Sequence, residues 1–283
     1  MVGRALVLGG GGVTGVAWEL GMLAGLAEHG VDLRDADLVI GTSAGSVVGA
    51  LITSGTGLEE LYASQLAPPE PHRPARMGIV TILRWGLAVA CSRGSEQVGA
   101  RVGKMALARV TVPEAERRGV IAGLLRGHTW PQRALLVTAV DAESGEFAAF
   151  ATGSQVGGIA VTLVDAVAAS CSVPGVWPPT TIGGRRWIDG GVRSATNADL
   201  AAGYERVVVL APIARGLRTA TGAVAQVAAL REQAHVALIT PDTAARGAIG
   251  RNLFDPARRA PAARAGRSQA GSATAEVARV WSG

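Results

Sequence analysis

Cysteine, lysine and aromatic residues are all scarce in this sequence. The 283 residues include only two cysteines, Cys91 and Cys171, which lie far apart and form no CxxC pair. This spacing excludes a disulfide framework and a structural zinc site, and it is typical of a reducing compartment. Aromatic residues make up 4% of the chain while alanine and glycine are abundant, which favours close-packed helices over a β-sandwich.

Long apolar runs are also lacking. No stretch reaches the roughly 20 apolar residues that span a bilayer. The segment Met1–Leu8 enters a glycine cluster too early for the apolar core of a signal peptide. We therefore expect a cytoplasmic protein, soluble or in peripheral contact with a membrane. No acidic cluster has the spacing of a calcium loop, and we expect neither a metal nor another cofactor.

The formal net charge is +5, and arginine carries nearly all of it because Lys104 is the only lysine. No basic stripe is interleaved with aromatic residues, so we expect no binding of nucleic acid. A solvated basic surface is the commoner meaning of such a charge. The alternative is attraction to an anionic membrane surface or to a phosphate-bearing lipid.

Short apolar runs alternate with segments of helical spacing. Ala5–Leu8 is an apolar run that stops at four glycines, and helical spacing follows over Val16–Glu28. A second run, Asp37–Ile40, precedes a helical segment over Ser46–Thr53. This order predicts a three-layer α/β sandwich with a mostly parallel central sheet. Further strands or helices are expected over 134–140, 146–152, 162–171, 185–188 and 205–211.

The length suits one α/β domain over residues 1–283, but two regions break the pattern. In the variable region 56–130, the prolines of Pro68–Pro74 exclude regular structure. The nearly all-apolar segment Met77–Cys91 suits a lid, an interfacial helix or a buried helix. The tail from Pro241 is rich in Ala, Arg, Gly and Ser. This composition leaves room for disorder, with a closing helix over Thr274–Trp281.

The strongest motif is Gly41-Thr42-Ser43-Ala44-Gly45, a GxSxG sequence between a predicted strand and a predicted helix. In that context the serine occupies a strained turn that holds its hydroxyl clear of the sheet. Only small neighbours such as Gly41 and Gly45 tolerate the crowding. The motif predicts a nucleophile elbow with Ser43 as nucleophile, and the simpler alternative is a glycine turn in which Ser43 caps the helix.

The glycine-rich segment Gly9–Gly15 precedes the first predicted helix. Adjacent glycines let backbone N–H groups converge, which suits either an oxyanion hole or a phosphate cradle. Gly10-x-Gly12-x-x-Gly15 also fits the dinucleotide fingerprint, with Asp35 or Asp37 about 20 residues further along. This segment alone leaves an NAD(P)-binding oxidoreductase open.

A third motif, Asp189-Gly190-Gly191, follows a short predicted strand. The two glycines leave the carboxylate on a bare turn that another loop can approach closely. By itself this sequence is most simply a β-turn.

Taken in order, these three motifs resemble the patatin-like phospholipase family. That family has a glycine-rich oxyanion loop after its first strand, a GxSxG elbow and a downstream DGG aspartate. The segment Ala169–Pro179 also resembles the family's approach to its aspartate, and the likeness runs from residue 5 to about residue 211.

The resemblance implies a lipid acyl hydrolase with a Ser43–Asp189 dyad and no catalytic histidine. Asp189 would be the general base, and the amides of Gly10, Gly11 and Gly12 would hold the oxyanion. The implied substrate is an acyl ester of a phospholipid, lysophospholipid or neutral lipid. Because a free carboxylate is a weak base, we expect burial to raise the proton affinity of Asp189.

Two positions depart from the family pattern. Thr14 stands where the family usually has Arg or Lys near the end of the glycine loop, which removes one attraction for anionic head groups. Asn197 is followed by Ala198, where a proline is common. Neither departure affects the dyad.

Three other functions remain to be weighed. An ordinary α/β-hydrolase needs a histidine after its acid, and His235 is the only one beyond Asp189, without a small-residue loop around it. An oxidoreductase leaves the elbow and the DGG turn unexplained. A non-catalytic membrane-binding relative would be marked by loss of Ser43 or Asp189, and both are present.

Overall fold

The computed structural model describes residues 3–68, 75–109 and 112–282. Eight strands of this part form one sheet: β1 (Arg4–Leu8), β2 (Leu38–Gly41), β3 (Ala134–Asp141), β4 (Phe147–Phe150), β7 (Thr180–Ile182), β8 (Arg185–Asp189), β9 (Arg206–Leu210) and β10 (His235–Ile239). The order is β10-β9-β1-β2-β3-β8-β7, with β4 paired to β3. The five strands from β10 to β3 are parallel, and β4, β7 and β8 run antiparallel to their neighbours. The predicted mostly parallel sheet is confirmed.

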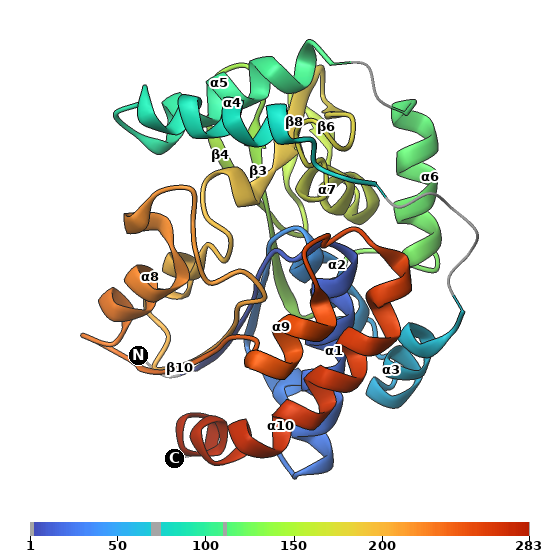
Figure 1. The fold of residues 1–283 in the computed structure, drawn as a ribbon, viewed down its shortest axis with the longest axis vertical. Helices are drawn as coiled ribbons and strands as arrows, with labels where there is room; N and C mark the ends of the chain where they lie inside the picture. Colours follow the sequence, from blue (N-terminus) through green and yellow to red (C-terminus); the bar gives the residue numbers. More distant parts are fainter. Residues whose placement is uncertain (1–2, 69–74, 110–111, 283) are drawn as a thin grey trace.

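Ten α-helices surround the sheet in the described residues: α1 (Gly12–Glu28), α2 (Ala44–Thr53), α3 (Leu58–Leu66), α4 (Ile79–Ala90), α5 (Ser95–Leu107), α6 (Glu114–Leu124), α7 (Leu163–Ser170), α8 (Ala223–Leu230), α9 (Thr243–Ile249) and α10 (Arg259–Ser282). A separate ribbon pairs β5 (Gln155–Val156) with β6 (Ile159–Ala160). In Figure 1, α10 runs beside α1 in the lower half, and α4 and α5 lie together at the top.

Helices cover both faces of the sheet because the strand side chains alternate between them. Leu6 and Leu8 of β1 belong to one apolar core with α1, α2, α7 and α10. Ala5 and Val7 belong to a second core, on the opposite face, with α8. A third small core joins α4 and α5 to β3 and β8. These layers are those of the predicted α/β sandwich.

The predicted elements are present, with boundaries shifted by a few residues. Helix α1 begins at Gly12, so the end of the glycine segment is already helical, and Asp189 is the last residue of β8. The hairpin expected after residue 134 is β3 with β4. The sequence patterns did not predict α3, α5, α6, α8 or β10. Of the proline segment 68–74, residues 69–74 lie outside the described residues.

Residues 241–282 of the C-terminal tail form α9, α10 and the turns between them. The disorder considered for part of this tail is therefore not found. Helix α10 begins at Arg259, well before the predicted closing helix, and it packs closely against α1. Glycines allow this approach: a Cβ at Gly21 would lie 2.0 Å from the Ala263 carbonyl oxygen, and one at Gly266 would lie 2.3 Å from the Trp18 carbonyl oxygen. The interface combines close backbone contact with buried side chains such as Trp18.

Helix α4, within the predicted segment Met77–Cys91, has most of its apolar side chains in solvent. Ile79, Leu83 and Leu87 are 75%, 68% and 64% exposed, while Thr81 and Ala88 face inward. Of the three readings of this segment, a buried helix is therefore wrong. None of the described helices combines the length and apolar character needed to cross a membrane.

Candidate active site

The sheet register brings Ser43 and Asp189 together although they lie far apart in sequence. Val137 of β3 pairs with Gly41 of β2 on one edge and with β4 on the other. Ala139, two residues further, pairs with β4 and with Asp189 of β8. Strands β2 and β8 therefore lie end to end along one edge of β3, with their carboxyl ends facing each other. Ser43 follows β2 directly, and Asp189 ends β8.

Ser43 occupies the strained elbow that the GxSxG motif predicts. Its φ is 52° and its ψ is −115°, a backbone conformation that costs a non-glycine residue on the order of 1–3 kcal/mol. A Cβ at Gly45 would lie 2.0 Å from the Leu8 carbonyl oxygen, and one at Gly41 would lie 2.5 Å from Ser46 Cα. A side chain at either flanking position would collide with the backbone, so both positions require glycine. The Ser43 side chain makes no capping hydrogen bond to α2, so the helix-cap alternative is wrong.

The end of α7 and the turn after it hydrogen-bond to the backbone of the elbow. The Ser43 N–H donates to Ser170 Oγ at 2.8 Å, and the Cys171 thiol donates to the Ser43 carbonyl oxygen at 3.4 Å. Burial raises the pKa of the Cys171 thiol to about 12, so it stays protonated and unreactive. The segment Ala169–Pro179, noted for its family likeness, therefore contacts the predicted nucleophile directly.

Asp189 is buried, with 4% of its surface exposed. Its Oδ1 accepts the Gly191 N–H at 2.7 Å, and the Ser43 side chain lies beside its carboxylate. Burial raises the pKa of Asp189 to about 7, although the Gly191 N–H and the Ser43 side chain lower it in part. A carboxylate with a pKa near neutrality is matched to general-base catalysis.

The glycine loop lies against the elbow, and a Cβ at Gly10 would sit 3.5 Å from Ser43 Cβ. Gly10, Gly11 and Gly12 all line the same cavity as Ser43. The Gly10 N–H, however, donates to the Ala195 carbonyl oxygen at 2.7 Å. Among the described residues, the N–H groups of Gly11 and Gly12 have no such partner, so both are free to donate to a ligand.

Asn197 links the GxSxG elbow to the DGG turn, a role that sequence reasoning missed. Its Nδ2 donates to Thr42 Oγ1 at 3.0 Å and to the Ser194 carbonyl oxygen at 2.9 Å, and it lies 3.3 Å from Thr138 Oγ1 and 3.4 Å from the Gly190 carbonyl oxygen. Its φ is 49°, a left-handed conformation that asparagine tolerates well. The available signal was an asparagine shortly after the DGG motif.

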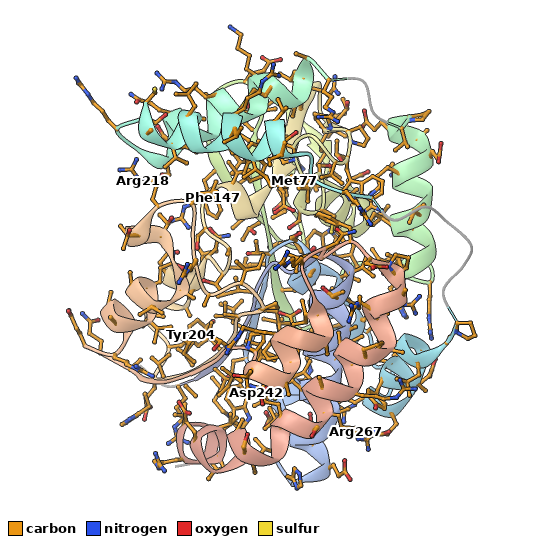
Figure 2. The ribbon with its side chains drawn as sticks, in the orientation of Figure 1. Met77, Phe147, Tyr204, Arg218, Asp242 and Arg267 are labelled. Carbon is orange, nitrogen blue, oxygen red and sulfur yellow. The ribbon has the colours of Figure 1, made fainter. Side chains whose placement is uncertain are left out.

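Ser43 and Asp189 open into a cavity of about 600 Å³. Met77, Ile82 and Trp85, in and just before α4, form one apolar wall, and Leu253 and Phe254 form another. Met77 is labelled in Figure 2 at the entry to α4. The volume and the apolar walls suit an acyl chain.

Three arginines also line this cavity: Arg76, Arg215 and Arg251. None of them forms an ion pair or a side-chain hydrogen bond within the described residues. Thr14 is fully buried, with its hydroxyl 3.4 Å from the Leu253 carbonyl oxygen. Thr14 carries no charge, so the positive charge of the cavity comes from these three arginines on other loops.

Glu19 of α1 is a second buried carboxyl group that the sequence did not single out. Neither of its oxygens has a hydrogen-bond partner among the described residues. Burial raises the pKa of Glu19 well above its ordinary value. The nearby Gly9 N–H lowers it only in part. Burial therefore disfavours the charged form of Glu19, next to the start of the glycine loop.

The geometry argues against the competing functions. His235 begins β10, at the opposite end of the parallel strands from Ser43, so it cannot complete a triad. Asp35 and Asp37 precede β2, whereas a dinucleotide needs its acid at the carboxyl end of that strand. Asp35 is instead paired with Arg4 at 2.9 Å. Within the described residues, no group of three His, Cys, Asp or Glu side chains is placed to hold a metal.

Fold and site together define an α/β protein with a nucleophile elbow, a glycine loop and a buried aspartate. A family model described as patatin-like phospholipase matches residues 6–202, and the chain belongs to this family. The resemblance drawn from the motifs is confirmed. Membership supports lipid acyl hydrolase activity in general.

Two solved structures are similar to this chain. VipD from Legionella pneumophila is 12% identical, with a TM-score of 0.45, over 97% of this chain and 66% of VipD. The type III effector protein ExoU is 14% identical, with a TM-score of 0.39, over 98% of this chain and 53% of ExoU. The chain thus spans about two thirds and about half of these proteins, and likeness at this level carries no argument about function. No curated protein matches the chain.

Proposed function

We propose that this protein is a serine acyl hydrolase that cleaves a carboxylic ester of a phospholipid or lysophospholipid through a Ser43–Asp189 dyad. The observation that carries the proposal is the Asp189 carboxylate, which is buried, lies beside the Ser43 side chain in the same cavity and has a pKa of about 7. Such a group can accept a proton at neutral pH without help from a histidine.

In the proposed acylation step, the Asp189 carboxylate takes the proton of the Ser43 hydroxyl while Oγ forms a bond to the ester carbonyl carbon. The carbonyl oxygen becomes an oxyanion, which accepts hydrogen bonds from the N–H groups of Gly11 and Gly12. When the C–O bond to the alcohol breaks, the departing oxygen takes the proton from Asp189. The acyl group remains on Ser43.

Deacylation repeats these roles with water. Asp189 takes a proton from a water molecule that attacks the acyl-enzyme carbonyl carbon, and the bond between the acyl group and Ser43 Oγ then breaks. Oγ recovers the proton from Asp189, and a fatty acid leaves. The strained backbone at Ser43 holds Oγ in place through both steps.

A phospholipid fits the cavity better than a neutral lipid does. The apolar walls suit an acyl chain, and Arg76, Arg215 and Arg251 suit a phosphate that lies near the mouth. The exposed apolar face of α4 borders this cavity through Ile82 and Trp85. Peripheral contact of this face with a bilayer would bring the ester within reach of Ser43.

The test compares p-nitrophenol release from medium-chain acyl esters by wild type, Ser43→Ala and Asp189→Asn. Each substitution is expected to lower kcat/KM by about 1,000-fold or more while the fold is retained. Ser272→Ala, an exposed serine on α10, is the matched control and keeps full activity. An active Ser43→Ala protein, or a wild type inert on every ester while binding lipid, would show that the proposal is wrong.

Substitution of Arg215 and Arg251 by glutamine separates the substrate classes. The double variant should lose about 10-fold in kcat/KM on phospholipid and little on the uncharged p-nitrophenyl ester. Equal losses on both substrates would favour a neutral lipid.

A further inference from the structure

A second cavity, of about 620 Å³, lies between α4 and α5. Its polar lining is cationic: Arg84 comes from α4, Arg101 and Lys104 from α5, and Arg109 from the segment after α5. Trp85, Met105 and the turn Pro174–Gly175 supply most of the remaining surface. No acidic residue lines the cavity.

These four positive charges are not neutralised by the protein. None forms an ion pair within the described residues, and the one acidic residue of α4 and α5 is Glu96, in the first turn of α5. Arg109 donates to Thr81 Oγ1 at 3.1 Å, and Arg101 donates to the Cys91 carbonyl oxygen, so both bind neutral oxygens. Arginines elsewhere do meet carboxylates, as Arg118, Arg185, Arg193 and Arg267 each show.

Arg84 and Lys104 have no hydrogen-bond partner in the described part of the chain. Both side chains are exposed at the cavity. Four like charges that share one cavity raise the free energy of the unliganded protein, and a bound anion would relieve this repulsion. Arginine and lysine with free N–H donors match a phosphate in particular.

The surroundings of the cavity indicate where that phosphate comes from. Ile82, Leu83 and Leu87 of α4 are more than half exposed beside it, a surface that a soluble anion would leave uncovered. A bilayer that contains anionic lipid offers phosphate and hydrocarbon together. Trp85 lines both this cavity and the one that holds Ser43. A membrane bound here would therefore face the mouth of the candidate active site.

We infer that the cavity between α4 and α5 binds the phosphate head group of an anionic phospholipid in a bilayer, a lipid separate from the one that is cleaved. This docking site serves the proposed lipid hydrolysis and in that sense rests on it. Binding does not need turnover, however, so the two proposals can fail separately.

The test measures binding of Ser43→Ala protein to sedimented vesicles, so that no lipid is consumed. Vesicles of phosphatidylcholine with phosphatidylglycerol are compared with phosphatidylcholine alone. Adding Arg84→Gln and Lys104→Gln should weaken binding to the anionic vesicles about 10- to 30-fold, since each basic residue near such a surface contributes about a 5-fold gain. The matched control, Arg264→Gln with Arg279→Gln, removes the same charge from exposed positions on α10 and should bind as before.

Four results bear on the inference. A selective loss in the α4–α5 variant, restored in Arg84→Lys with Lys104→Arg, supports the site. Equal losses in the two glutamine variants would mean that net charge alone matters, and an equal loss on pure phosphatidylcholine would mean that no head group is bound; either result overturns it. Displacement by soluble glycerol phosphate at the same phosphate concentration also overturns it, since the site would then take a free anion.

Discussion

Helices α4 and α10 lie in environments opposite to those that their compositions suggest. Helix α4 is largely apolar, yet Ile79, Leu83 and Leu87 are exposed. Helix α10 is rich in Ala and Arg and has few large apolar residues, yet it packs along α1 with Gly266 and Ala270 buried. For these two helices, apolar composition alone does not decide burial, because close backbone approach buries α10 against α1.

The difference separates two tasks. The contact between α1 and α10 is close, and it packs the helix that starts at the glycine loop beside Ser43. Helix α4 keeps an apolar face free at the mouth of the Ser43 cavity. Substitutions at the contact between α1 and α10 should therefore change stability, whereas substitutions on the exposed face of α4 should change lipid binding.

The largest effect is expected for Gly21→Ala in α1. The added Cβ would lie 2.0 Å from the Ala263 carbonyl oxygen, so α10 must move away. We expect the free energy of unfolding to fall by about 3 kcal/mol, despite the better helix propensity of alanine. Chemical denaturation measures this directly. An unchanged midpoint would mean that the close contact with α10 is not needed.

The second-largest effect is expected for Glu19→Gln, and it is a gain in stability. Because burial raises the pKa of Glu19 in the folded protein, the unfolded chain loses this proton at a lower pH than the folded one. Wild-type stability is therefore penalised as pH rises above the ordinary carboxyl value, and the variant escapes the penalty. The variant should be more stable by about 1–3 kcal/mol near neutrality, with little advantage at about pH 4. A difference that does not change with pH would contradict a buried neutral acid.

On α4, replacement of Leu83 and Leu87 by serine should lower activity on phospholipid vesicles about 10-fold. Activity on a soluble ester and the free energy of unfolding should stay nearly unchanged, because both side chains are already in solvent. Val224→Ser, an equally exposed apolar residue on α8, is the control and should change neither. Parallel losses on vesicles and soluble ester would remove α4 from lipid binding.

The smallest effect is expected for Gly86→Ala, the counterpart of Gly21→Ala in the exposed helix. No atom lies within 4 Å of the added Cβ. The free energy of unfolding should rise by about 0.5–1 kcal/mol through helix propensity alone. Destabilisation would indicate that α4 has a packed partner on that face.

The sequence predicted the parts of the site that depend on local backbone geometry. Ser43, Gly41 and Gly45 form a contiguous turn whose strain requires those residue types. Asp189 could be tied to Ser43 only through the family resemblance, because the register of β2 and β8 along β3 is a long-range property. Asn197 and Glu19 were missed, since their importance comes from neighbours that sequence spacing does not identify. Helix α10 was only partly predicted, because its close packing depends on Gly21 and Gly25 of α1, a long-range match that sequence spacing does not identify.

The most direct test of the account is the pH dependence of Ser43 phosphonylation by a fluorophosphonate, in which Oγ bonds to phosphorus and fluoride leaves, with the labelled residue identified by mass spectrometry. Because Asp189 must be deprotonated to act as base, the rate should be low in acid, rise with an apparent pKa of about 7 and level off above it. Asp189→Asn should label very slowly at every pH. Label on a residue other than Ser43, or a wild-type rate that does not change between about pH 5 and pH 9, would contradict the Ser43–Asp189 dyad.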